Sequence, residues 1–167
     1  SHKQLAQDTA ANRAKLDPIL AGFAGKPVDA LAADSTATRM GERLFIDNCA
    51  ACHGREGHGN RVIGAPNLID ATWIYGGDGA TLLTSILDGR HGTMPPFSSS
   101  LDKAAIENLA NYVLSLSGRD HSPAKAKLGA ENFAVCAACH GPTGTGNPAL
   151  GAPNLTTADE LYGRDLA

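Results

Sequence analysis

A six-residue stretch, Cys-Ala-Ala-Cys-His-Gly, occurs twice in this chain of 167 residues, at 49–54 and 136–141, and the two copies contain all four cysteines. The similarity extends beyond the motif, because residues 49–76 align without a gap with residues 136–163 at a constant offset of 87. Upstream, Gly-Glu-Arg-Leu-Phe (41–45) resembles Gly-Ala-Glu-Asn-Phe (129–133), with one residue fewer before the second cysteine pair. So many matches in a fixed register indicate a tandem duplication of one small domain, not convergent loop composition.

The duplication divides the chain into four expected parts. We predict an N-terminal helical extension over 1–39, a first domain over 40–117, a polar linker over 118–127 and a second domain over 128–167. The second domain is expected to be incomplete, because the chain contains no counterparts of residues 81–117.

The hydrophobic spacing predicts a mainly α fold. Helices are expected over 38–53, 78–89 and 101–118, the last with Asp102 as its N-cap and Gly118 after its end. Residues 4–23 look helical but only weakly amphipathic, and Pro18 predicts a break or a restarted turn there. Aromatic residues make up only 5% of the chain, so a core built from side chains alone would be thin.

Charge and hydropathy narrow the classes of partner. The 14 basic residues are balanced by 17 acidic ones, for a net charge of -3, and no basic stripe favours nucleic-acid binding. No apolar run approaches the roughly 20 residues that a membrane-spanning helix needs.

The Cys-x-x-Cys-His spacing is the strongest chemical signal. Two thiols three positions apart can add to the two vinyl groups of haem, and the adjacent histidine then reaches the iron, so the motif predicts covalent c-type haem. A redox dithiol would need a βαβ context, and a zinc site would need partner ligands at zinc spacing. A disulfide across two alanines would be strained and would leave the histidine unexplained. The predicted attachment residues are Cys49, Cys52 and His53 in the first repeat, and Cys136, Cys139 and His140 in the second.

The sixth iron ligand is expected to be Met94, one of the two methionines of the chain. It lies in Gly-Arg-His-Gly-Thr-Met-Pro-Pro-Phe, 41 residues after His53, in a loop that can cross to the side of the iron opposite the imidazole. A thioether there raises the reduction potential and closes the iron to other ligands. A lone methionine is more often a filler of the core, and that is the expectation for Met40, but a loop rich in glycine and proline is a poor core element.

Five further residues are candidates for contacts around the haem. The backbone carbonyls of Pro66 and Pro153, in the two Gly-Ala-Pro-Asn-Leu segments, could accept a hydrogen bond from the histidine Nδ1, although proline could equally serve only the turn. Trp73 and Tyr75 could line the haem or bind a propionate, with ordinary packing as the equal alternative. Arg90 could pair with a propionate or be a solvated surface residue.

Taken together, the segments Gly-Glu-Arg-Leu-Phe, Cys-Ala-Ala-Cys-His, Gly-Ala-Pro-Asn-Leu, Met-Pro-Pro-Phe and Leu-Ala-Asn-Tyr-Val resemble a class I cytochrome c domain. The resemblance implies that Gly41, Phe45 and Tyr112 form the crossing contact between the first and last helices of the first domain. The tandem copies and the segments around Trp73 and Met94 are similar, more narrowly, to the dihaem subunit III of cbb(3)-type haem-copper oxidases.

That resemblance implies a function and a location. It implies a periplasmic part, anchored in the inner membrane by an upstream helix that this sequence does not include. It also implies an electron-transfer subunit without turnover of its own, which passes electrons from soluble donor cytochromes toward the other oxidase subunits.

One departure from the family pattern keeps alternatives open. The counterpart of Met94 in the second domain would fall beyond Ala167, so the second haem has no evident methionine. It could be five-coordinate and bind gases, borrow a histidine or the methionine of a neighbouring chain, or be absent. A haem enzyme active on thiosulfate or peroxide has less support, because no spare cysteine exists. A domain-swapped dimer is one assembly that could cover the incomplete domain.

Overall fold

The computed structural model describes residues 2–157, and it is mainly α, as predicted from the sequence. Within that range no strand is present, and only two isolated β-bridges occur, Asn60 with Ala65 and Asn147 with Ala152. The last part of the expected second domain, residues 158–167, lies outside the described residues. The helices are α1 (His2–Ala21), α2 (Val28–Ala32), α3 (Ser35–Asn48), α4 (Ala50–His53), α5 (Gly79–Leu87), α6 (Lys103–Leu116), α7 (Pro123–Asn132) and α8 (Ala134–His140), with 3-10 turns η1 (Arg61–Ile63) and η2 (Pro148–Leu150).

The chain divides into two compact units, Ser1–Cys49 and Ala50–Ala167. The predicted domain boundaries do not follow this division and remain predictions. None of the helices among the described residues combines the length and the apolar character that crossing a membrane requires.

The first unit contains α1, α2 and α3. The predicted break at Pro18 is wrong, because α1 continues through it to Ala21. Only one further turn follows Pro18, so the helix loses one backbone hydrogen bond close to an end that would fray in any case. Helix α3 begins after Asp34, whose carboxylate accepts hydrogen bonds from the Thr36 and Ala37 amides. These bonds lower the pKa of Asp34, because they stabilise its charged form.

The predicted helices of the second unit are present with small shifts at their ends. The carboxylate of Asp102 caps α6 by accepting a hydrogen bond from the Ala105 amide at 2.8 Å, as predicted. Gly118 follows the helix end with φ of 68°, a backbone conformation that favours glycine.

Residues 123–127, expected to belong to a linker, instead form the beginning of α7. The Ser122 hydroxyl caps this helix and Pro123 occupies its first turn. Serine followed by proline is a recognised helix start, so this signal was available in the sequence and was missed.

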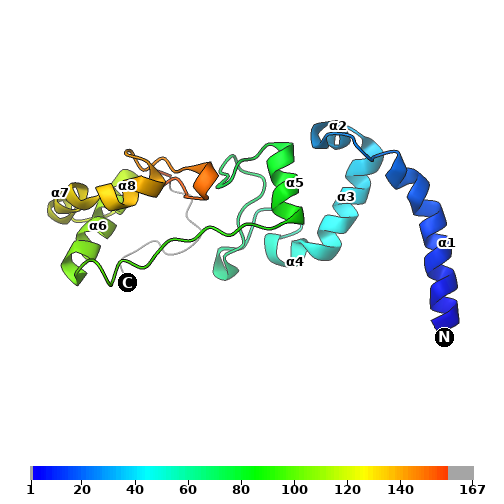
Figure 1. Cartoon of the computed structure of the whole chain (residues 1–167), viewed down its shortest axis with the longest axis horizontal. Helices are drawn as coiled ribbons and strands as arrows, with labels where there is room; N and C mark the ends of the chain where they lie inside the picture. The colour runs from blue at the N-terminus through cyan, green and yellow to red at the C-terminus, as the bar shows by residue number, and fades with distance from the viewer. Residues whose placement is uncertain (1, 158–167) are drawn as a thin grey trace. The chain divides into compact units, whose positions relative to one another are not determined.

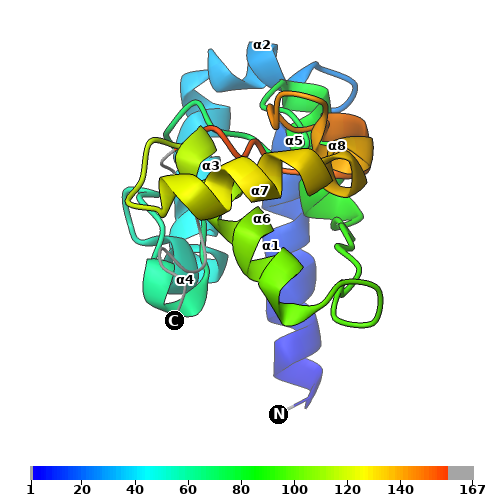
Figure 2. The same ribbon diagram turned by 90° about the vertical axis from the view of Figure 1, so that its left-hand side faces the viewer.

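Helices α6 and α7 form the main helix pair of the second unit, and α7 lies across α6 (Figures 1 and 2). The two rings of Tyr112 and Phe133 meet edge to face, with centroids 5.0 Å apart. Helix α6 carries the buried residues Leu109 and Leu114, α7 carries Ala126, and Phe133, which follows α7, is itself buried.

The aromatic partner of Tyr112 is therefore not the one expected. Tyr112 packs on Phe133, the repeat counterpart of Phe45, and a Cβ on Gly41 would meet no atom within 4 Å. The pairing of α6 with α7 occurs within one chain, whereas the swapped dimer remains a prediction.

Candidate haem sites

Each histidine of the two motifs is followed by a loop of the same construction. The amide of Gly59 donates to the His53 carbonyl at 2.8 Å, and the amide of Gly146 donates to the His140 carbonyl at 2.8 Å. A Cβ on Gly59 would lie 2.6 Å from the Ala65 carbonyl oxygen, and one on Gly146 would lie 2.7 Å from the Ala152 oxygen. Both glycines have positive φ, so only glycine closes this loop without strain.

The two loops hold the histidines through the predicted hydrogen bonds. His53 Nδ1 lies 3.0 Å from the Pro66 carbonyl oxygen, and His140 Nδ1 lies 2.9 Å from that of Pro153. Because a carbonyl oxygen only accepts, Nδ1 carries a proton in both rings, and in the neutral tautomer the lone pair is on Nε2. The hydrogen bond thus orients each imidazole so that Nε2 is the atom that could bind a metal.

The cysteines are free thiols in both motifs. Cys49 caps the end of α3, where its amide donates to the Phe45 carbonyl, and Cys52 lies in the short helix α4. The second motif lies within one continuous helix, α8, which carries both Cys136 and Cys139. Burial raises the pKa of the Cys136 thiol, whereas the other cysteines are exposed.

These groups fit a covalently attached haem. Such a haem needs two accessible thiols at this spacing and an imidazole whose free nitrogen is a neutral donor, and each repeat has this set. The carbonyl on Nδ1 would make the imidazole a more basic iron ligand and fix its plane.

The surroundings of the two histidines differ. His140 is buried, with 6% of its surface exposed, and the neighbouring Phe133 and Ala152 are buried as well. His53 is only half-buried, and Ala65 is the buried hydrophobic residue of its loop. The histidine of the second repeat is therefore the more buried of the two.

The aromatic and basic candidates have partners in the protein. The Trp73 ring lies against the backbone at Gly77, where a Cβ would be 2.5 Å from it. The Arg90 guanidinium donates to Ser85 Oγ at 3.0 Å and to the Thr81 carbonyl at 3.1 Å, and it lies 5.0 Å above the Tyr75 ring. A role of these three residues toward haem remains a prediction.

A long segment without helix connects α5 to α6 (Figure 1). Met94 lies in this segment, and 69% of its surface is exposed. Just before it, a Cβ on Gly92 would lie 2.7 Å from the Tyr75 hydroxyl and 3.3 Å from the Gly151 carbonyl oxygen. The Tyr75 ring also lies against Gly151, which ends η2. The segment that carries Met94 thus borders the loop of the second repeat, a contact that the sequence pattern did not predict.

A cleft of about 400 Å³ lies between the two Gly-Ala-Pro-Asn-Leu loops. Its described walls include Pro66, Asn67 and Trp73 from the first repeat and Pro153 and Asn154 from the second. The carbonyls of Pro66 and Pro153 hold the Nδ1 side of each histidine, so the cleft borders the loops behind the imidazoles.

Comparisons with known proteins identify relatives of the chain. Residues 36–113 match the family model described as cytochrome C oxidase, cbb3-type, subunit III. The chain is 46% identical over 152 residues to the cbb3-type cytochrome c oxidase subunit CcoP of Rubrivivax gelatinosus, an alignment that covers 90% of this chain and 49% of that protein. It is 43% identical over 154 residues to CcoP of Cereibacter sphaeroides, covering 83% of this chain and 52% of that protein. It is also 34% identical over 185 residues to CcoP of Rhodobacter capsulatus, covering 99% and 59%. The chain spans about half the length of the first two relatives.

Proposed function

We propose that the chain is an electron-transfer protein with two c-type haems, because residues 36–113 match the family model of cbb3-type cytochrome c oxidase subunit III. It would accept electrons from soluble donor cytochromes and pass them toward the other subunits of a cbb3-type terminal oxidase. The observation that carries this proposal is the duplicated histidine with Nδ1 on a proline carbonyl and Nε2 free, next to a thiol pair.

The cysteines and the histidine of each repeat would have different roles in binding haem. In each repeat the two cysteine thiols would add across the two vinyl groups, each forming a sulfur–carbon bond while its hydrogen goes to the other vinyl carbon. The histidine Nε2 of each repeat would hold the iron, and Met94 would be a further protein ligand to one iron. The bound group supplies one-electron exchange at iron, and the protein sets its potential through these ligands and their hydrogen bonds.

The location follows from the proposed function. On the proposed function, the site of action is the periplasm and the native protein is anchored in the inner membrane. The net charge of -3 supports docking through local patches and rapid release of donors.

Haem stoichiometry tests this proposal. We expect the chain, matured in a host that attaches c-type haem, to carry two covalent haems, measured as the pyridine haemochrome per chain. The double variant Cys49→Ala/Cys52→Ala and the matched double variant Cys136→Ala/Cys139→Ala should each retain one. A wild-type chain without covalent haem would refute the proposal.

Electron transfer is the second part of the test. After mixing with oxygen and a cbb3-type oxidase preparation that lacks its own subunit III, the reduced chain should be reoxidised at a rate that rises with the oxidase concentration. Buffer with oxygen alone should not reoxidise it. A chain that oxygen alone reoxidises, with no dependence on oxidase concentration, would contradict the relay.

Gas binding is the second candidate function, because the chain has one exposed methionine, Met94, for two irons. Titration of the reduced protein with CO measures open sixth positions. Uptake near zero would leave electron transfer alone, and about one CO per chain would identify one open iron.

A further inference from the structure

The loop that holds His140 is in contact, at its far end, with a tyrosine of the first repeat. The Tyr75 ring lies on the backbone at Gly151, where a Cβ would be only 2.3 Å from the Tyr75 hydroxyl oxygen and 2.5 Å from its Cε1. Gly151 ends the 3-10 turn η2 with φ of 64°. The position therefore needs glycine for two reasons, the left-handed backbone and the space that the tyrosine ring takes.

The contact with Tyr75 lies two residues from the carbonyl that orients His140. Between them, Ala152 and Asn147 exchange two backbone hydrogen bonds, 2.8 and 3.1 Å long, which join the two sides of the loop. The next carbonyl, that of Pro153, lies 2.9 Å from His140 Nδ1. A shift of the backbone at Gly151 is therefore passed to the imidazole through a short, hydrogen-bonded piece of chain.

The Tyr75 ring is itself held by the chain at the end of α5. The Arg90 guanidinium lies 5.0 Å from the centre of the ring. It is fixed there by hydrogen bonds to Ser85 Oγ at 3.0 Å and to the Thr81 carbonyl at 3.1 Å. Near the hydroxyl, a Cβ on Gly92 would be 2.7 Å from the Tyr75 oxygen. The ring thus meets protein on several sides, and these contacts keep it on Gly151.

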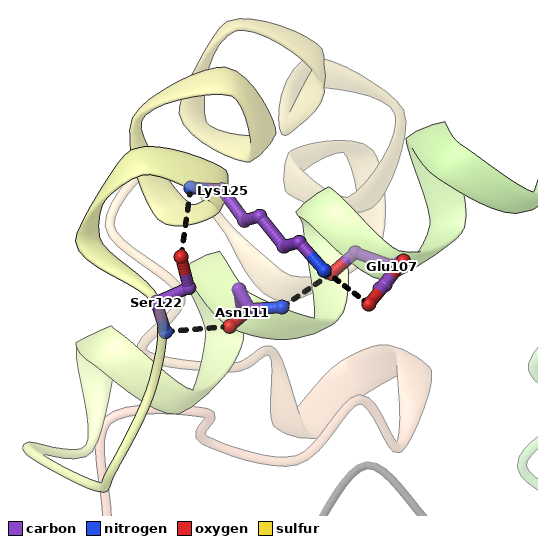
Figure 3. Close-up of polar contacts among 4 residues, drawn as sticks. All are labelled: Glu107, Asn111, Ser122 and Lys125. Carbon is purple, nitrogen blue, oxygen red and sulfur yellow. Dashed lines mark hydrogen bonds and ion pairs between the residues drawn. The ribbon is translucent and has the colours of Figure 1, made fainter.

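Helix α6, which supports the near half of the same loop, is anchored on α7 by polar contacts (Figure 3). The Lys125 ammonium forms an ion pair with Glu107, and the Ser122 amide donates to Asn111 Oδ1 at 2.7 Å. Asn111 is 1% exposed, so its hydrogen bond is buried. Helix α6 is therefore a firm support for whatever packs on its end.

The loop of His140 is thus held at two points. At the end of α6, Leu116 Cδ1 lies 2.9 Å from where a Cβ of Gly144 would be, in the first half of the loop. In the second half, Tyr75 packs on Gly151. The first point belongs to the helix pair of the second unit, whereas the second point depends on a side chain of the first repeat.

From these contacts we propose that Tyr75 is a positioning residue for the second haem site, because it holds the loop whose Pro153 carbonyl orients His140. This inference rests on the proposed haem attachment, and it gives Tyr75 a role toward the histidine of the other repeat. The hydrogen bond on Nδ1 makes the imidazole a more basic ligand. A looser loop would therefore raise the reduction potential of the iron at His140.

Exchange of the histidine Nδ1 protons with solvent tests this role. Reduction of the two-haem chain under CO makes both irons diamagnetic, so NMR can follow the Nδ1 protons of His53 and His140, which the single-haem chains assign. In Tyr75→Ala the His140 proton should exchange at least about tenfold faster, because the loop opens more often. The His53 proton is the internal control and should change by less than about twofold. No change at His140, or equal acceleration of both protons, would overturn the proposal.

The conservative variant and the reduction potential separate positioning from a general loss of stability. Tyr75→Phe keeps the ring on Gly151, so both the exchange of the His140 proton and the potential should stay as in the wild type. In Tyr75→Ala the potential of the iron at His140 should rise. A fall of that potential, or an equal rise in the two variants, would contradict the packing of the ring as the cause.

A pair of glycines tests the contact from the side of the loop, and it decides the question if Tyr75→Ala does not attach haem. Gly151 and Gly118 both have positive φ, 64° and 68°, so alanine strains the backbone at either position. A Cβ at Gly118 would meet no atom within 4 Å, whereas one at Gly151 would meet Tyr75.

Gly151→Ala should therefore accelerate the exchange of the His140 proton, and Gly118→Ala should not. Acceleration in both glycine variants, or in neither, would overturn the proposal, because backbone strain or the rest of the loop would then control the histidine. The proposed function fails separately, through the absence of covalent haem from the wild-type chain.

Discussion

The two repeats have the same histidine loop but different protein surroundings. His53 and His140 have matching hydrogen bonds to proline carbonyls, 3.0 and 2.9 Å long, and matching glycines that close the loop. His140 is buried whereas His53 is half-buried, and α6 packs on α7 of the second repeat. A short motif can therefore fix the orientation of a histidine through local hydrogen bonds. The protein core around that histidine depends instead on which helices pack beside it.

The largest contrast is expected between the two phenylalanines. Phe133→Ala should lower the free energy of unfolding by about 3–5 kcal/mol, because it removes a ring that is 4% exposed and its contact with Tyr112. Phe45→Ala should cost clearly less, because Phe45 is only half-buried. Urea unfolding of the two variants measures the difference. Equal losses would mean that α3 and α7 are packed alike.

A smaller effect is expected at the buried amide that joins α6 to the start of α7. Asn111→Ala should lower the free energy of unfolding by about 1–3 kcal/mol, because the Ser122 amide loses its acceptor. Asn48→Ala is the control, since Asn48 makes a similar bond to the Leu44 carbonyl on an exposed part of α3. That control should change stability by less than about 0.5 kcal/mol. A larger loss in the control would show that burial is not the cause.

The smallest effect concerns the pH dependence of the α6–α7 pair. The hydrogen bond and the charge of Lys125 lower the pKa of Glu107 from its ordinary value of 4.5. The folded state therefore favours the charged carboxylate, so this contribution is present above that value and disappears as the pH falls through the lowered pKa. Wild type should lose stability relative to Glu107→Gln as the pH falls below about 5.

Urea midpoints measured between neutral and acid pH test this, with Glu131→Gln on the exposed face of α7 as the control. Because both partners are exposed to solvent, the difference should be small and should shrink further in high salt. A pH dependence that Glu107→Gln leaves unchanged would contradict the role of the ion pair.

Much of the local structure could be predicted from the sequence. Asp102 and Gly118 mark the ends of α6, and the positions of Pro66 and Pro153 after the two histidines predicted their hydrogen bonds. These features depend on residues near one another in the chain, where capping groups and glycine conformations act directly. The start of α7 was equally visible in Ser122 and Pro123, although the polar composition of that stretch indicated a linker.

The choice of partner for α6 could not be predicted in this way. The same pattern, a glycine followed four positions later by a phenylalanine, occurs at Gly41 and Phe45 and again at Gly129 and Phe133. The resemblance to a single cytochrome c domain favoured the first pair as the partner of Tyr112. In the structure, the ion pair of Lys125 with Glu107 and the hydrogen bond from Ser122 to Asn111 stabilise the packing of α6 on α7. The connection from α6 to α7, residues 117–122, is also far shorter than that from α3 to α6, residues 49–102, which favours α7 by about 2 kcal/mol in loop closure.

The sequence by itself therefore determined the duplicated thiol and imidazole sets, the mainly α character and the loops that orient each histidine, because each depends on a few adjacent residues. Only the tertiary structure decided which repeat receives α6 and the segment that carries Met94. The physical reason is that α3 and α7 carry the same glycine and phenylalanine pattern, so this pattern alone does not determine where α6 packs. The packing of α6 depends on contacts distant in sequence and on the length of the connecting chain.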